Sequence, residues 1–275
     1  MTVDCHTHNF PDALAPRALA AMLGKLEGRL VPVGDGTLSS QLRDMDRCGV
    51  DLNVVCPVAT RPGQFQTIFD RARAVRDGRE GAAAAERLVQ LCSVHPADPE
   101  FASHLAAVAA EGFRGVKLHP RYQGFALDDP RHFPYFEAVR DAGLFVIAHC
   151  GYDPGFVGGP PACEPPQIAA LLSAVPGLKF VAAHLGGSCA EPAHAVDRLL
   201  PFPNCWLDTA VINLAENTDE ARRIVREWPA DRLVFGTDYF WRDPAEIAAW
   251  VRSNRPDAGD LELMFCGNAR RLLGL

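Results

Sequence analysis

Eight short apolar runs, separated by stretches with helical character, constrain the fold of this chain more than any other feature of its sequence. The runs are rich in β-branched residues and read VDCHTH (3–8), LNVVCPV (52–58), VQLCSVH (89–95), FRGVKLH (113–119), LFVIAHC (144–150), KFVAAH (179–184), CWLDTA (205–210) and RLVFGTD (232–238). Their apolar residues follow one another without alternation, a pattern typical of parallel strands that are covered on both faces. We therefore expect eight parallel strands.

The stretches between most of these runs predict helices. Residues 38–50 place Leu38, Leu42 and Met45 on one helical face, and Thr37 stands before them as an N-cap. Further helices are expected at 100–112, 131–143, 165–175, 191–200, 219–228, 243–253 and 267–275.

A strand followed by a helix, repeated eight times, is the pattern of a (β/α)8 TIM barrel, which is an α/β fold. We expect one such domain over residues 1–275. A doubly wound open sheet is the rival fold, but it would carry a Gly-rich fingerprint after an early strand, and the sequence has none. The Gly- and Pro-rich stretches 28–37 and 151–166 are then loops over one end of the barrel.

Composition excludes several classes of partner. The chain has 27 Lys and Arg against 34 Asp and Glu, a net charge of −7, so it lacks the basic footprint of a nucleic-acid-binding protein. Each apolar run is under about ten residues, too short to cross a bilayer, and no signal segment precedes the first run. We expect a cytoplasmic protein with no nucleic-acid or membrane partner. None of the nine cysteines forms a CxxC pair, which argues against a cysteine-ligated zinc.

Polar residues stand at the carboxyl ends of the predicted strands. They are His6, His8, Lys117, His119, His149, His184 and Asp238. In a TIM barrel the active site is built at this end, from residues on different strands. His6 and His8 are two residues apart, so both side chains lie on one face of a strand. Imidazole and carboxylate are ligands that suit zinc, manganese or iron.

A single histidine at a strand end is more often structural than a metal ligand. His119, which precedes a proline, retains the alternative of shaping its loop. The metal hypothesis therefore depends on five residues taken together, because the predicted barrel would bring all five to the same end. These are His6, His8, His149, His184 and Asp238.

The motifs around these residues resemble those of the amidohydrolase superfamily. They are HTH (6–8), GVKLHP (115–120), IAHCG (147–151), AAHLGG (182–187), GTDYF (236–240) and GNARRLLGL (267–275). More narrowly they are similar to the amidohydrolase-2 branch, the metal-dependent hydrolases and aromatic-acid decarboxylases that resemble aminocarboxymuconate-semialdehyde decarboxylase. The resemblance extends over nearly the whole chain.

The resemblance implies a role for each of the five residues. His6, His8, His149 and Asp238 would bind one divalent metal, usually zinc, with Mn²⁺ or Fe²⁺ as alternatives. His184 would act in acid–base chemistry or polarise the metal-bound water, and Asp238 would share proton transfer with metal binding.

Lys117 leaves two alternatives open. In binuclear members of the superfamily a carboxylated lysine at this strand bridges two metals. Otherwise its ammonium group would hold a substrate carboxylate. We favour one metal, with Lys117 at the substrate. The motif HPRY places His119, Arg121 and Tyr122 in the following loop, where we expect them to contact the substrate.

We therefore expect a metal-dependent hydrolase that uses a metal-activated water to cleave a C–O, C–N or C–C bond in a small carboxylated substrate. The rival is a lyase, a non-oxidative decarboxylase of an aromatic or unsaturated acid. A metal-free binding barrel would explain the fold but not the shared polar end. The substrate pocket is expected from loops 9–37, 59–64, 120–131 and 151–166. We expect a small-molecule partner. The sequence leaves open whether the chain forms a homo-oligomer.

Overall fold

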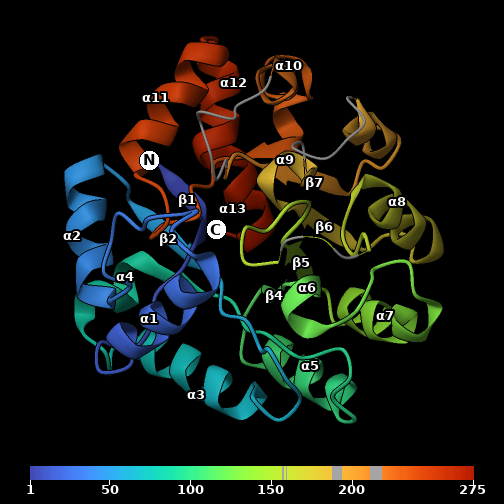
Figure 1. Cartoon of the computed structure of the whole chain (residues 1–275), viewed down its shortest axis with the longest axis horizontal. Helices are drawn as coiled ribbons and strands as arrows, with labels where there is room; N and C mark the ends of the chain where they lie inside the picture. Colours follow the sequence, from blue (N-terminus) through green and yellow to red (C-terminus); the bar gives the residue numbers. More distant parts are fainter. Residues whose placement is uncertain (157, 159, 188–193, 211–218) are drawn as a thin grey trace.

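In the computed structural model, residues 1–156, 158, 160–187, 194–210 and 219–275 are described. Eight parallel strands lie at the centre and helices surround them (Figure 1). The strands are β1 (Val3–Thr7), β2 (Leu52–Val55), β3 (Leu88–Gln90), β4 (Gly115–Leu118), β5 (Phe145–Ala148), β6 (Lys179–Ala182), β7 (Cys205–Asp208) and β8 (Leu233–Val234). Each falls within or beside one of the predicted runs, so the predicted α/β fold is confirmed.

The strands form two parallel sheets, in the order β1–β2–β3 and β4–β5–β6–β7–β8. Backbone contacts join the sheets at both seams. Cys92 forms a parallel bridge with Val116 just beyond β3, and the backbone N–H of Cys5 donates to the carbonyl of Phe235 at 2.8 Å. The eight strands therefore stand as in a TIM barrel.

The helices follow the predicted alternation, with additions. They are α1 (Ala15–Leu26), α2 (Leu38–Cys48), α3 (Phe65–Arg76), α4 (Ala82–Arg87), α5 (Phe101–Ala110), α6 (Pro120–Gln123), α7 (Phe133–Asp141), α8 (Pro165–Ala174), α9 (Ala183–Gly187), α10 (Asp219–Glu227), α11 (Pro244–Asn254), α12 (Ala258–Glu262) and α13 (Asn268–Leu273). The stretch 9–37, predicted as a loop, contains α1. Of the helix predicted at 191–200, residues 191–193 lie outside the described residues, and Ala195–Leu199 forms a short 3-10 helix. No helix in the described part of the chain is long and apolar enough for a membrane span.

The predicted start of α2 is confirmed. Thr37 is its N-cap, and the Thr37 hydroxyl accepts a hydrogen bond from the backbone N–H of Ser40 at 2.9 Å. Leu38 and Met45 are buried against the core, as the helical spacing predicts.

Replacing the cap of α2 tests its contribution to stability. Thr37→Ala leaves the Ser40 N–H without its acceptor, so we expect the free energy of unfolding to fall by about 1 kcal/mol. Urea denaturation of the two proteins measures this difference. An unchanged midpoint would show that solvent replaces the cap without cost.

Apolar side chains fill the barrel away from the polar end. Cys5, Val54, Ile147 and Val181 belong to one buried cluster inside the ring of strands. From α13, Ala269, Leu272 and Leu273 pack against the same cluster and cover that end. A second, larger cluster lies between the strands and the surrounding helices. The polar strand ends therefore stand on a rigid apolar base.

Candidate metal centre

A local irregularity in β1 sets the position of the two histidines. The pairing register between β1 and β2 shifts between Asp4 and Thr7. The buried Asp4 carboxylate accepts from the backbone N–H of His6 at 3.1 Å and from the hydroxyl of Thr237 at 2.5 Å. Burial raises the pKa of Asp4 to about 7. Asp4 thus ties the HTH segment to the segment that carries Asp238, a role that the sequence did not reveal.

Three of the four predicted ligands come together. His8 Nε2 lies 3.0 Å from Asp238 Oδ1, and His6 Nε2 lies 3.5 Å from the same oxygen. The ligand atoms of His6, His8 and Asp238 all lie within 4.8 Å of one another. His149, the fourth predicted ligand, is outside this group. We call these three residues the HHD group.

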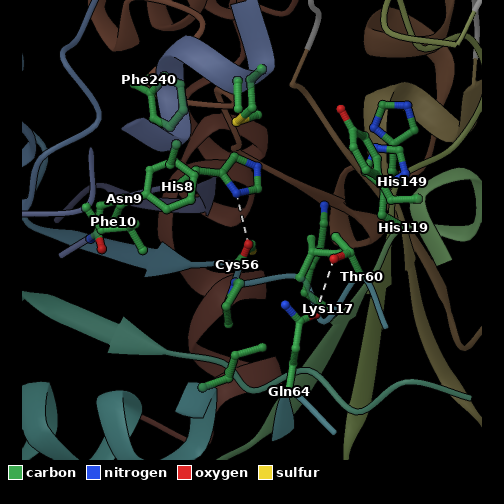
Figure 2. Close-up of a pocket in the computed structure, with 18 of the residues that line it drawn as sticks. His8, Asn9, Phe10, Cys56, Thr60, Gln64, Lys117, His119, His149 and Phe240 are labelled. Carbon is green, nitrogen blue, oxygen red and sulfur yellow. Dashed lines mark hydrogen bonds between the residues drawn. The ribbon is translucent and has the colours of Figure 1, made fainter. Parts of the chain in front are cut away.

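The two ring contacts of His8 are compatible with a cation bound between His8 and Asp238. Its Nδ1 lies 2.9 Å from the carbonyl oxygen of Cys56, which can only accept, so Nδ1 carries the proton (Figure 2). The other nitrogen, Nε2, faces the Asp238 carboxylate oxygen at 3.0 Å. At this distance a proton or a metal ion must lie between the two atoms. The donor set of the HHD group therefore suits a divalent metal.

Asp238 is held as a carboxylate. Burial raises its pKa, but the hydrogen bond with His8 and the charges of His6 and His184 outweigh burial and hold the pKa well below its ordinary value. Its backbone has φ of 60°, in the left-handed region that few residues other than glycine adopt. Its N–H donates to the His6 carbonyl at 2.8 Å, which holds this conformation.

The second ring nitrogen of His6 has its own partner. His6 Nδ1 lies 2.8 Å from Asp208 Oδ2, at the end of β7, and both side chains are buried. With Nδ1–H donated to this carboxylate, Nε2 is left with its lone pair, as a metal ligand requires. Sequence reasoning missed Asp208. The available signal was an aspartate inside the apolar run 205–210.

Lys117 reaches the same histidine. Its Nζ lies 2.7 Å from His6 Nε2, and the lysine is 1% exposed. Burial and the charge of Lys117 lower the pKa of His6 well below its ordinary value. In Figure 2 the Lys117 amine extends into the space between His8 and His149.

Two glycines bring His149 and His184 together. The loops after β5 and β6 approach so closely that a Cβ on Gly151 would lie 2.6 Å from the Cα of Gly187. His184 Nε2 then lies 2.8 Å from His149 Nδ1. The backbone of His184 is left-handed, with φ of 58°. The glycines of the HCG and HLGG motifs are therefore needed for this close approach.

His184 stands behind His149 as seen from the cavity. Its backbone N–H donates to Asp208 at 2.7 Å, and its Nδ1 lies 2.6 Å from the carbonyl of Ala210. Nδ1 therefore carries the proton, and Nε2 accepts from His149. Among the described residues that line the cavity, His149 is present and His184 is not.

Of the three predicted substrate contacts after β4, His119 and Tyr122 line the cavity and Arg121 is not among the described lining residues. His119 Nε2 lies 3.0 Å from Asp153 Oδ2, and the His119 ring stacks on His149 with centroids 4.1 Å apart. Burial lowers the pKa of His119. Tyr122 meets the edge of His119 and lines the cavity with it. Arg121 donates to the carbonyl of Gly158 at 3.2 Å and is not among the described lining residues.

These side chains border one cavity of about 930 Å³. The HHD group, Lys117 and His149 form its polar end. Figure 2 shows His8, Lys117 and His149 there. The loop after β2 adds Thr60 and Gln64, and α1 adds an apolar wall. A volume of this size is that of a small-molecule site.

The family follows from the whole sequence. Residues 3–275 match the family model described as Amidohydrolase. The chain belongs to the amidohydrolase family. The resemblance seen in the strand-end motifs is thereby confirmed, whereas no curated protein matches the sequence.

Solved structures similar to this amidohydrolase share its fold. An uncharacterised TIM-barrel protein from Bordetella bronchiseptica is 20% identical, covers 99% of this chain and 98% of its own, and has a TM-score of 0.77. A probable 2-pyrone-4,6-dicarboxylic acid hydrolase from Acinetobacter baumannii is 17% identical, with coverage of 100% and 99% and a TM-score of 0.66. A dihydroxybenzoic acid decarboxylase from Polaromonas sp. is 17% identical, with coverage of 100% and 97% and a TM-score of 0.68.

The Asp208 contact in this amidohydrolase can be tested directly. In Asp208→Asn the new amide faces donors on both sides, His6 Nδ1–H and the backbone N–H of His184, so one hydrogen bond must be lost. We expect metal affinity to fall by about 10- to 100-fold, as for other partners of metal-binding histidines. Competition with a chromophoric chelator measures it. Unchanged affinity would mean that Asp208 does not set the His6 tautomer.

Proposed function

We propose that this chain is a metal-dependent hydrolase of a small carboxylated substrate. One divalent ion is held by the HHD group, with His149 as the fourth ligand, because His149 lines the same cavity and its Nε2 is the ring atom not tied to His184. To bind the ion, this Nε2 gives up its 3.3 Å contact with the carbonyl of Tyr152. When bound, such an ion supplies a Lewis acid and lowers the pKa of water.

One observation carries the choice of hydrolysis. At the polar end of the cavity the Asp238 carboxylate is ionised, so it can accept a proton. Hydrolysis begins with removal of a proton from water, whereas decarboxylation requires a proton to be delivered to the carbon that loses CO₂. An ionised carboxylate at this position suits the first reaction.

Each residue of the site has a separate role. Asp238 accepts the proton of the attacking water. Asp238 then returns this proton to the leaving group. His184 accepts the Nδ1–H of His149 at 2.8 Å and so serves acid–base chemistry through the ring of the fourth ligand. His119 and Tyr122, which line the cavity, contact the substrate. We also propose that Arg121 contacts the substrate, which requires its guanidinium to leave the carbonyl of Gly158.

Lys117 supports a single metal. An ion held at His6 would use the Nε2 that Lys117 Nζ contacts at 2.7 Å, and the ammonium would then face the cavity. There it can hold a substrate carboxylate. Two metals per chain together with a carboxylated Lys117, detected by metal analysis and mass spectrometry, would overturn this proposal.

Zinc is the first choice of metal, because two or three imidazoles and one carboxylate are typical of catalytic zinc. Manganese is the alternative, since the Polaromonas decarboxylase was solved with bound manganese. Activity after reconstitution with each metal distinguishes the two.

The decisive experiment assays the metal-loaded enzyme on lactones, amides and aromatic or unsaturated carboxylic acids. Release of acid and release of CO₂ are measured side by side. We expect acid release without CO₂. Release of CO₂ would establish decarboxylation, the second candidate, which the resemblance to the Polaromonas decarboxylase favours.

A further inference from the structure

One side of the cavity is built entirely from apolar side chains. They come from α1 and its flanking residues and are Leu14, Ala18, Ala21, Met22, Leu26 and Leu30. Positions 14, 18, 21 and 22 are spaced i, i+4, i+7 and i+8, which places them on one face of a helix. The proposed reaction needs no such wall, because its polar groups come from the strand ends.

Contacts at the end of α1 and beyond it hold this wall in place over the cavity. Leu26 packs in a buried cluster with Phe240 and Trp241, which follow β8. On the other side, Arg29 Nη1 donates to the carbonyl of Pro154 at 2.9 Å, in the loop after β5. Lys25 Nζ lies 5.1 Å from the centre of the Tyr122 ring. The apolar face is therefore anchored to both sides of the cavity.

The volume shows how much of a substrate this wall can cover. A cavity of about 150 Å³ holds benzene, and the present one is about 930 Å³. A one-ring acid held at the HHD group and Lys117 would fill only part of this volume and would leave Leu14, Ala18 and Ala21 uncovered. Burying that wall is favourable, by an amount proportional to the apolar area covered.

We propose that the substrate is an amphiphilic acid whose carboxylated head lies at the HHD group and Lys117 and whose extended aliphatic chain packs along α1. The position of the head rests on the proposed function. The chain is aliphatic because the wall consists of Leu, Met and Ala side chains. Specificity for chain length then belongs to α1.

Binding of straight-chain carboxylates to the metal-loaded enzyme tests this proposal. The series from acetate to decanoate is titrated by calorimetry. We expect Kd to fall by about threefold to fourfold for each methylene group that reaches the wall. Affinity that does not change with chain length, or no binding of the longer acids, would overturn the proposal.

A matched pair of variants locates the effect. Ala20 and Ala21 are adjacent exposed residues of α1, but only Ala21 lines the cavity. We expect Ala21→Asp to flatten the chain-length dependence and Ala20→Asp to leave it as in the wild type. Ala18→Asp, at a second lining position, should act like Ala21→Asp. Equal slopes in all three variants would contradict a role for α1.

The two proposals can fail separately. Chain-length dependence in binding without hydrolysis of any lactone or amide would refute the proposed reaction and leave the amphiphilic ligand in place. Hydrolysis at a rate independent of chain length, with flat binding, would refute only the role of α1.

Discussion

Asp238→Asn is expected to remove the divalent metal while leaving the barrel folded. The substitution replaces the carboxylate of the HHD group with a neutral amide. We therefore expect metal affinity to fall by more than about 100-fold, a larger loss than when only a hydrogen-bond partner of a ligand is replaced. Turnover should fall by at least about 10³-fold, because a Lewis acid contributes several kcal/mol. Metal content after dialysis and initial rates measure the two effects.

The fold should survive this change for a specific reason. The backbone of Asp238 has φ of 60°, and asparagine tolerates the left-handed region as well as aspartate does. Circular dichroism checks this. The matched control is Asp153→Asn, a second buried aspartate of the same cavity, bonded to His119. Metal lost from Asp153→Asn and kept in Asp238→Asn would move the metal centre to His119.

His184→Asn is expected to keep the metal and lose about 10²-fold in turnover, the scale of acid–base catalysis. His184 does not belong to the HHD group, but its Nε2 accepts the hydrogen bond from His149. Without this acceptor nothing holds the proton on Nδ1 of His149, so the ring can change its tautomer and orientation. Metal analysis and kcat are the measurements.

Asparagine again fits the left-handed backbone at this position, where φ is 58°. His132→Asn serves as the control, because His132 contacts Phe125 and does not line the cavity. Full turnover in His184→Asn would remove His184 from the mechanism, whereas loss of metal would show that His184 acts on metal binding and not on proton transfer.

The sequence predicted those parts of the structure that depend on local periodicity. The apolar runs gave the strands, and Thr37 gave the start of α2. It did not reveal α1, which lies in the stretch 9–37. The stretch was predicted as a loop because its final part, 28–37, is rich in Gly and Pro, although Leu14, Ala18 and Met22 follow helical spacing. This helix owes its place to tertiary packing more than to a local pattern.

The proposed site was likewise predictable from the sequence only in part. Because parallel strands carry their carboxyl ends to one edge, the sequence alone determined that His6, His8 and Asp238 would share one end of the barrel. Only the tertiary structure decided their hydrogen-bond partners. His6 meets Asp208 across 202 residues of sequence, and His149 stands with His184 and His119 instead of with the HHD group. Such pairings depend on how loops approach one another in space, and neither the period of a strand nor that of a helix records them.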